Sequence, residues 1–172
     1  MSLDARDYPE LPTIDDCDKL VFPQNLLKTM ITQTIFAVAD NDSRPIYTGT
    51  LFDIDGDQIN LVSVDGYRLA LRQEKLESSV FEGKKSFIVP GTALNDVERI
   101  CGDEGDVTIF VGEKHISFEI GETVIISRRL EGEFLNYRNS IPTDFKVMVK
   151  VNKQDFLRSV DRVALMIVNE QV

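Results

Sequence analysis

A chain of 172 residues is long enough for one domain, or for one domain with parts of its neighbours, and 42% hydrophobic residues can bury a core. The net charge of −10 argues against a conventional DNA-binding protein, because such proteins gain affinity by neutralising phosphates with lysine and arginine. No apolar run approaches the roughly 20 residues of a membrane helix, so no membrane role is expected.

The cysteine content points to a reducing compartment. Only Cys17 and Cys101 occur, too few for a disulfide framework or a structural zinc site. The N-terminus also has neither the basic region nor the apolar core of a secretory signal. We therefore expect a soluble, cytoplasmic protein.

The first half of the chain predicts a strand, a helix and three further strands. Residues 1–18 are polar and rich in turn formers, which is typical of a linker. A short strand at 20–22 precedes Pro23, which opens a predicted helix with Leu27, Ile31, Thr34, Ile35 and Val38 at helical spacing.

Three alternating segments follow, at 48–53, 58–64 and 67–72, and predict an antiparallel meander. Asp55-Gly56 and Asp65-Gly66 stand between them. Because glycine adopts positive φ without a Cβ clash, we expect both dipeptides to form tight hairpin turns.

The same order of elements then recurs. A strand at 86–89 and a helix from Thr92 to about Cys101 precede strands at 107–111, 115–120 and 123–128. Leu51–Leu61 can be aligned with Ile109–Glu119, so the sequence predicts an α+β fold made of a duplicated strand, helix and three-strand unit.

A third copy of this unit begins near the end of the chain. Residues 146–151 predict a strand, and 153–167 predict a helix with the same apolar spacing. The expected organisation is a linker at 1–18, a complete domain at 19–142 and the start of another domain at 143–172.

Two patterns suggest a metal site or a catalytic site, and each has a simpler structural explanation. Asp53–Asp57 alternates carboxylates as a calcium loop does, but Val64 stands where the closing acidic ligand is needed, so a hairpin turn is favoured. His115 is the only histidine and has no serine or thiol motif to act with, which favours a strand-end surface residue. We predict no catalytic residues, metal or cofactor.

Four motifs, in order along the chain, resemble the bacterial DNA polymerase III β subunit family, the replicative sliding clamps. The likeness extends from the linker to Glu170 and is strongest at Arg44–Gly49, Val64–Ala70, Phe87–Gly91 and Gly132–Arg138. It implies a DNA clamp fold, with antiparallel sheets outside and helices on one face, and identifies residues 19–142 as the family's middle domain.

The resemblance also implies a function and partners. Members encircle double-stranded DNA without reading its sequence and hold the polymerase on the template. They act as processivity factors, not as enzymes themselves. The implied partners are DNA polymerase subunits, the clamp loader and repair proteins, which bind through short peptide motifs, and the implied assembly is a homodimeric ring. The first domain and most of the third are absent from this chain, so we do not expect it to close that ring.

Two sets of site residues follow from the resemblance. The DNA-facing residues are Asn41, Arg44 and Arg99, although a solvated loop cation explains Arg44 equally well. Two departures from the family pattern are Thr92, where many members have lysine, and Leu135, where proline is common. The peptide groove is implied at Tyr47, Val64, Gly66, Tyr67, Arg68, Leu69, Leu135, Asn139 and Ser140.

Without the motifs, an intracellular protein-binding module with no DNA role fits an acidic, duplicated α+β domain equally well. An enzyme is the third alternative. A clamp predicts loss of polymerase processivity when the full-length gene is damaged, whereas an enzyme predicts turnover of a substrate by the isolated domain.

Overall fold

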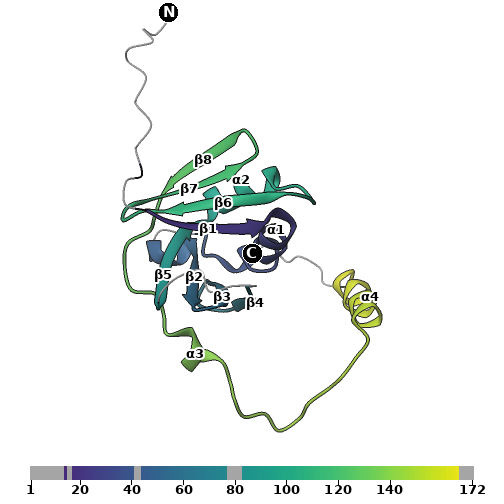
Figure 1. Cartoon of the computed structure of the whole chain (residues 1–172). Helices are drawn as coiled ribbons and strands as arrows, with labels where there is room; N and C mark the ends of the chain where they lie inside the picture. The colour runs from purple at the N-terminus through teal and green to yellow at the C-terminus, as the bar shows by residue number, and fades with distance from the viewer. Residues whose placement is uncertain (1–13, 15–16, 41–43, 77–82, 167–172) are drawn as a thin grey trace, which may run out of the picture. The chain divides into compact units, whose positions relative to one another are not determined.

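The computed structural model describes residues 14, 17–40, 44–76 and 83–166 (Figure 1). The chain divides into two units, residues 1–135 and residues 136–172. In the described part of the chain, none of the helices has the length and apolar character needed to cross a membrane.

One sheet of the first unit has the strand order β1-β6-β7-β8, and all its pairs are antiparallel. Every second residue of β6 is buried, as expected for a strand with one face on the core. The strands are β1 (Asp18–Pro23), β6 (Asp106–Val111), β7 (His115–Ile120) and β8 (Thr123–Arg128).

The other sheet has the order β4-β3-β2-β5 and is also antiparallel. Nearly every residue of β2 and β3 is buried, because these strands occupy the centre of the sheet. Its strands are β2 (Gly49–Asp55), β3 (Gln58–Val64), β4 (Leu69–Lys75) and β5 (Lys84–Pro90).

The predicted duplication is confirmed, but its two copies exchange their first strands. β1 begins the first copy and pairs with β6 of the second, whereas β5 begins the second copy and pairs with β2 of the first. Each sheet therefore contains strands from both copies, and neither copy can complete its sheet alone.

Two helices cover the core where the copies meet. α1 (Gln24–Thr32) and α2 (Gly91–Ile100) pack against each other (Figure 1). The Thr32 hydroxyl donates a hydrogen bond of 2.6 Å to a Glu98 carboxylate oxygen and links the two helices. Beneath them, Phe52 and Phe87 stack with ring centres 5.2 Å apart.

Residues 129 and 130, which follow β8, form hydrogen bonds to a strand of one sheet and to a connection between strands of the other. The main-chain N–H of Leu130 donates to the Ile88 carbonyl on β5 at 3.0 Å. Arg129 donates from Nη1 to the Gly112 carbonyl in the β6–β7 connection at 2.6 Å, and its guanidinium carbon lies 5.5 Å from the centre of the Phe87 ring.

The first predicted helix is too long. α1 ends at Thr32, and a separate 3-10 turn, η2 (Ile35–Ala37), follows. The Thr34 hydroxyl donates to the carbonyls of Met30 and Ile31, which occupies acceptors at the helix end. Thr34, Ile35 and Val38 therefore lie outside the helix to which their spacing assigned them.

Asp65-Gly66 is not the tight two-residue turn that we predicted. The last pair of the β3–β4 ladder is Val64 with Leu69, so the connection contains four residues and β4 begins two residues later than expected. The β2–β3 connection is a two-residue hairpin turn, but its two residues are Gly56 and Asp57 and not Asp55-Gly56, since Asp55 pairs with Gln58 as the last residue of β2; Gly56 has φ of 62°.

The second unit contains α3 (Tyr137–Ser140) and α4 (Lys153–Ala164). The Asn152 side chain caps α4 by accepting hydrogen bonds from the main-chain N–H groups of Gln154 and Asp155. The strand predicted at 146–151 is wrong: a strand needs a partner, and none pairs with this segment among the described residues.

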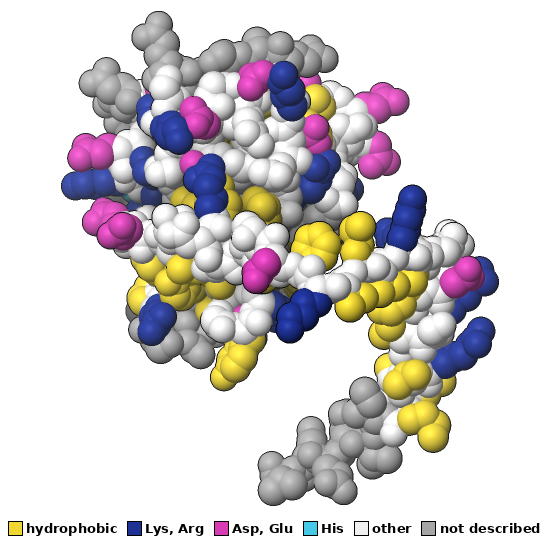
Figure 2. Space-filling view, turned by 90° about the horizontal axis from the view of Figure 1, so that it is seen from below, with side chains coloured by type: hydrophobic (Ala, Val, Ile, Leu, Met, Phe, Trp, Pro, Cys, Tyr) yellow, Lys and Arg dark blue, Asp and Glu magenta, His cyan; other side chains and the backbone are white. Residues whose placement is uncertain are grey.

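One side of α4 is apolar, and all its described residues are exposed (Figure 2). Phe156, Val160 and Val163 line a hollow of about 340 Å³ on this side. The helix therefore has the amphipathic character that the sequence predicted, although it ends at Ala164.

Candidate functional site

The β3–β4 connection is held by the side chain of Asp65. Its Oδ1 accepts hydrogen bonds from the main-chain N–H of Tyr67 at 2.9 Å and of Arg68 at 3.0 Å. These two bonds, followed by the interaction with the Arg68 side chain, hold the pKa of the Asp65 carboxyl below its usual value of 3.8. The loop shape thus depends on the oxygen acceptor of Asp65 and on Gly66, which has φ of 95°.

Arg68 is oriented by two contacts. Its Nε donates to Asp65 Oδ2 at 2.8 Å, and its guanidinium carbon lies 5.8 Å from the centre of the Phe36 ring. Phe36 belongs to η2, which packs against β3 and β4. The early end of α1 therefore brings an aromatic ring to the hairpin.

Apolar groups surround this cation at different depths. Val64 is buried, Leu69 is half-buried, and Tyr67 is fully exposed at the tip of the loop. Phe36 remains 57% exposed although Arg68 lies over it. The hairpin end thus presents two accessible aromatic rings beside an oriented guanidinium.

A second cluster lies on η3 (Pro45–Thr48). The Tyr47 ring meets the Phe134 ring edge to face, with centres 5.5 Å apart, and Arg44 lies over Tyr47 at 5.9 Å. A main-chain hydrogen bond of 2.8 Å from Ala39 N–H to the Tyr47 carbonyl links η3 to the segment that follows η2.

Close packing of a glycine against an isoleucine side chain supports this cluster. A Cβ added at Gly132 would lie 2.7 Å from Ile46 Cγ2, and Gly132 has φ of 137°. Glycine is therefore needed where the 129–134 segment passes η3. Tyr47 and Phe134 meet because two segments distant in sequence approach this closely.

The remaining predicted groove residues fall on both sides of the unit boundary. Leu135 is half-buried at the end of the first unit. Asn139 and Ser140 are exposed on α3 of the second unit. Gly66, Tyr67 and Arg68 are gathered on one loop, with Val64 and Leu69 as the strand residues on either side of it.

The predicted DNA-facing residues occupy separate elements. Asn41 lies outside the described residues. Arg44 is exposed at the start of η3, against Tyr47, whereas Arg99 is exposed in the last turn of α2, with Nη1 3.9 Å from Asp96 Oδ1. The prediction that they share a DNA-facing surface stays a prediction.

The packed helices α1 and α2 have no excess of positive charge. Lys28 and Arg99 are their only cations, and Asp96 and Glu98 supply two carboxylates, so the net charge of α1 and α2 together is zero. Thr92 is exposed at the start of α2 and adds no charge.

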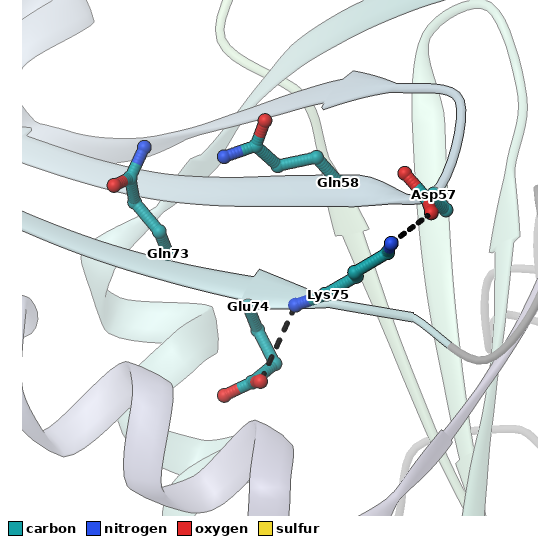
Figure 3. Close-up of a pocket in the computed structure, with 5 residues that line it drawn as sticks. All are labelled: Asp57, Gln58, Gln73, Glu74 and Lys75. Atoms are coloured by element: carbon teal, nitrogen blue, oxygen red, sulfur yellow. Dashed lines mark hydrogen bonds and ion pairs between the residues drawn. The ribbon is translucent and has the colours of Figure 1, made fainter.

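A shallow polar hollow of about 400 Å³ lies at the other end of β3 and β4 (Figure 3). Lys75 Nζ lies 3.1 Å from Asp57 Oδ2, and Asp55 forms a similar pair with Lys84 at 3.0 Å. These carboxylates thus pair with lysines on neighbouring strands. No group of three or more acidic, histidine or cysteine side chains suited to a metal occurs in the described ranges.

Sequence reasoning missed three contributors to these clusters. It did not single out Phe36, treated Asp65 only as a turn former, and quoted Phe134 without assigning it a role. Phe36 lies outside the apolar spacing of the first helix, so an aromatic residue without an assigned core position was the signal available in the sequence. Nothing local in the sequence indicates that Phe134 reaches Tyr47.

Comparison with known proteins gives one consistent result. Residues 21–136 match the family model described as DNA polymerase III beta subunit, central domain. The beta sliding clamp of Bacillus subtilis is 33% identical over 165 residues, which are 95% of this chain and 43% of that protein. The beta sliding clamp of Chlamydia pneumoniae is 32% identical over 166 residues, covering 96% of this chain and 45% of that protein. The chain thus spans less than half the length of these relatives.

Solved structures agree with the sequence match. The DNA polymerase sliding clamp of Bacillus subtilis superposes with a TM-score of 0.91 at 32% identity, covering 98% of this chain and 44% of that one. The DNA polymerase III subunit beta of Pseudomonas aeruginosa gives a TM-score of 0.89 at 26% identity, with 98% and 46% covered. By fold and by sequence, this chain belongs to the DNA polymerase III beta subunit family, with the family's central domain at residues 21–136.

Proposed function

We propose that the protein containing this chain is a sliding clamp of the bacterial replicative DNA polymerase. It encircles duplex DNA, keeps the polymerase on its template and recruits partner proteins, and it makes or breaks no covalent bond itself. The observation that carries this proposal is the match of fold and sequence over nearly the whole chain to proteins named beta sliding clamps.

The proposed DNA contact is sequence-independent and weak. Arg44, Arg99 and Asn41 are the proposed contacts. Because α1 and α2 have zero net charge and the chain carries −10, retention on DNA has to come from the closed ring and not from adhesion.

The proposed partner site is a peptide groove that includes the β3–β4 loop and Tyr47. Exposed aromatic rings, a half-buried leucine and an oriented arginine are a combination that suits short extended peptides. The partners proposed for it are polymerase subunits, the clamp loader and repair proteins. Leu135, Asn139 and Ser140 complete the proposed set.

Primer extension on a long, singly primed template tests the function. The full-length gene product, with its loader and polymerase, should increase product length per binding event. A matched Leu69→Asp variant should lose this increase because an acidic side chain enters the proposed groove. Undiminished processivity of the variant would contradict the site, and no processivity with the unaltered protein would contradict the function.

The assembly has its own test. The proposed ring is a homodimer of full-length subunits, and the 172-residue chain spans less than half of its relatives. We propose that this chain alone does not close a ring. Light scattering at micromolar concentration should then exclude a stable closed dimer, and observation of one would contradict the proposal.

A protein-binding module without a DNA role is the second candidate. The observation in its favour is the absence of positive excess on α1 and α2. It predicts peptide binding by the full-length protein but no effect on the length of extended primers, so the same assay separates the two functions.

A further inference from the structure

Arg68, in the β3–β4 loop cluster, uses only part of its hydrogen-bonding capacity within the described residues. Its Nε is bonded to Asp65 Oδ2 at 2.8 Å, and no hydrogen bond from its Nη atoms occurs within the described residues. The Arg68 side chain is 54% exposed, against 17% for Asp65. The Nη groups are therefore available to a ligand, while Asp65 lies deeper and stays paired.

The charge of this pair decides what kind of ligand it attracts. Asp65 stays ionised at neutral pH because two main-chain N–H groups and Arg68 all donate to it. A carboxylate brought to the Nη groups would be attracted by Arg68 and repelled by Asp65. A main-chain carbonyl carries no net charge, accepts the same hydrogen bonds and meets no repulsion.

Apolar surface lies beside the same guanidinium. Phe36 is 57% exposed below it, and the neighbouring Tyr67 is fully exposed. Tyrosine is enriched among the few residues that carry most of the binding free energy at protein interfaces. Contact with these rings does not depend on the charge of the peptide.

We propose that Asp65 is a specificity-determining residue: by neutralising Arg68, it prevents the loop from favouring acidic segments. The loop then selects peptides by apolar side chains and by main-chain carbonyls that accept hydrogen bonds from Arg68. This inference rests on the proposed peptide-binding function and adds to it the role of Asp65 in setting the charge preference of the loop.

Asp65→Asn is the informative variant. Asparagine keeps the oxygen that accepts the N–H groups of Tyr67 and Arg68, so the loop retains its hydrogen bonds but the arginine loses its counter-charge. Asp57→Asn is the matched control, because it changes the net charge equally and unpairs Lys75 at the opposite end of the hairpin.

The probes are synthetic peptides of about ten residues with one leucine and one phenylalanine as anchors. They carry glutamate or glutamine at each flanking position in turn. Affinities for the full-length protein would be measured by fluorescence anisotropy at low and high salt. Wild type and Asp57→Asn should bind the two forms of each peptide within about twofold of each other, since surface charges contribute little.

Asp65→Asn should bind at least one glutamate form about fivefold to tenfold more tightly than its glutamine form at low salt, as expected for a charge-assisted hydrogen bond. Salt should reduce this preference. The double variant Asp65→Asn, Arg68→Gln should abolish it, which would assign the preference to Arg68.

Three outcomes would overturn the inference. A wild-type preference for glutamate as large as that of Asp65→Asn would show that Asp65 does not neutralise the arginine. An equal preference in Asp57→Asn would show a general charge effect. If Asp65→Asn binds the peptides with the same ratio of glutamate-form to glutamine-form affinity as wild type, the inference alone is wrong. If no peptide binds wild type or any variant, the proposed groove is wrong as well.

Discussion

At the scale of single residues, the site depends on an aspartate that acts on its own loop. Asp65 accepts from Tyr67, from Arg68 and from the Arg68 side chain, so one carboxylate sets both the shape of the connection and the position of the guanidinium. Sequence alone identifies the turn-forming dipeptide. The hydrogen bonds hold the four-residue connection between Val64 and Leu69 in place.

The first prediction concerns the titration of Asp65. A carboxyl whose folded pKa is lowered stabilises the folded state above its unfolded pKa, near 3.8, and this contribution is lost as pH falls through the folded pKa. Carboxyl-carbon NMR should therefore give a midpoint below 3.8. Because the main-chain N–H of Tyr67 is the largest cause, Arg68→Gln should leave most of the depression. A midpoint at or above 3.8 in the unaltered protein would contradict the loop geometry.

The second prediction concerns Gly49, where β2 begins beside η3. A Cβ there would lie 2.5 Å from the Val89 carbonyl oxygen and 2.8 Å from Leu130 Cδ1. Gly49→Ala should lower the free energy of unfolding by about 1–3 kcal/mol, because the nearest atom is backbone and cannot move aside. Urea denaturation measures the loss.

Gly102→Ala is the matched control for Gly49→Ala. Its added Cβ would lie 3.5 Å from the nearest atom, Gln24 Oε1, which is ordinary contact. Its stability should stay within about 0.5 kcal/mol of wild type. Equal losses at the two positions would refute the steric explanation.

At the scale of elements, the exchange of first strands is the main feature. β1 and β5 each complete a sheet built mostly from the other copy of the repeat. The packing of η2 on β3 and β4 has a comparable effect, since it brings Phe36 to Arg68. Both features make distant segments depend on one another.

The third prediction tests this dependence. Phe22 of β1 is fully buried, and β1 pairs with β6 along its whole length. Phe22→Ala should lower the free energy of unfolding by about 3–5 kcal/mol and weaken hydrogen-exchange protection of β6, some 80 residues away in sequence. Urea denaturation and exchange mass spectrometry would measure the two effects.

Val21→Ala provides the control, because Val21 lies next to Phe22 on the same strand but is 51% exposed. The change should cost less than about 1 kcal/mol and leave β6 protected. Loss of β6 protection in both variants would indicate damage to the strand as such, and an unaffected β6 in Phe22→Ala would contradict the role of the buried side chain.

At the scale of the whole molecule, the negative net charge limits the strength of the proposed DNA contact. The chain carries −10, and the two packed helices carry no net charge. Affinity for linear duplex should therefore be weak and should fall with salt.

The fourth prediction concerns the contribution of Arg99 to the salt dependence of duplex binding. Arg99→Gln should reduce the dependence of log affinity on log salt by about one and act equally on all sequences, as loss of one phosphate contact does. Lys114→Gln, an exposed cation in the β6–β7 connection, is the matched control and should not alter the dependence. Titration of a fluorescent duplex would measure it, and base-specific binding at moderate salt would disagree with the proposal.

Much of the fold could be predicted from the sequence because local alternation records which side chains face the core. The bounds of β3, β7 and β8 agree with the prediction residue for residue, and the repeated order of elements indicated the duplication. The resemblance to the sliding clamps likewise rested on short local motifs, and the family match confirms it.

Contacts between residues far apart in sequence could be learned only from the tertiary structure, because no local pattern records them. Pairing of β1 with β6, approach of Phe36 to Arg68 and contact of Phe134 with Tyr47 join residues far apart in sequence. The predicted strand at 146–151 failed for the same reason, since β propensity is realised only when another strand accepts its hydrogen bonds. The sequence by itself determined most of the elements and the family, whereas long-range packing set their partners, some of their bounds and the surroundings of each side chain.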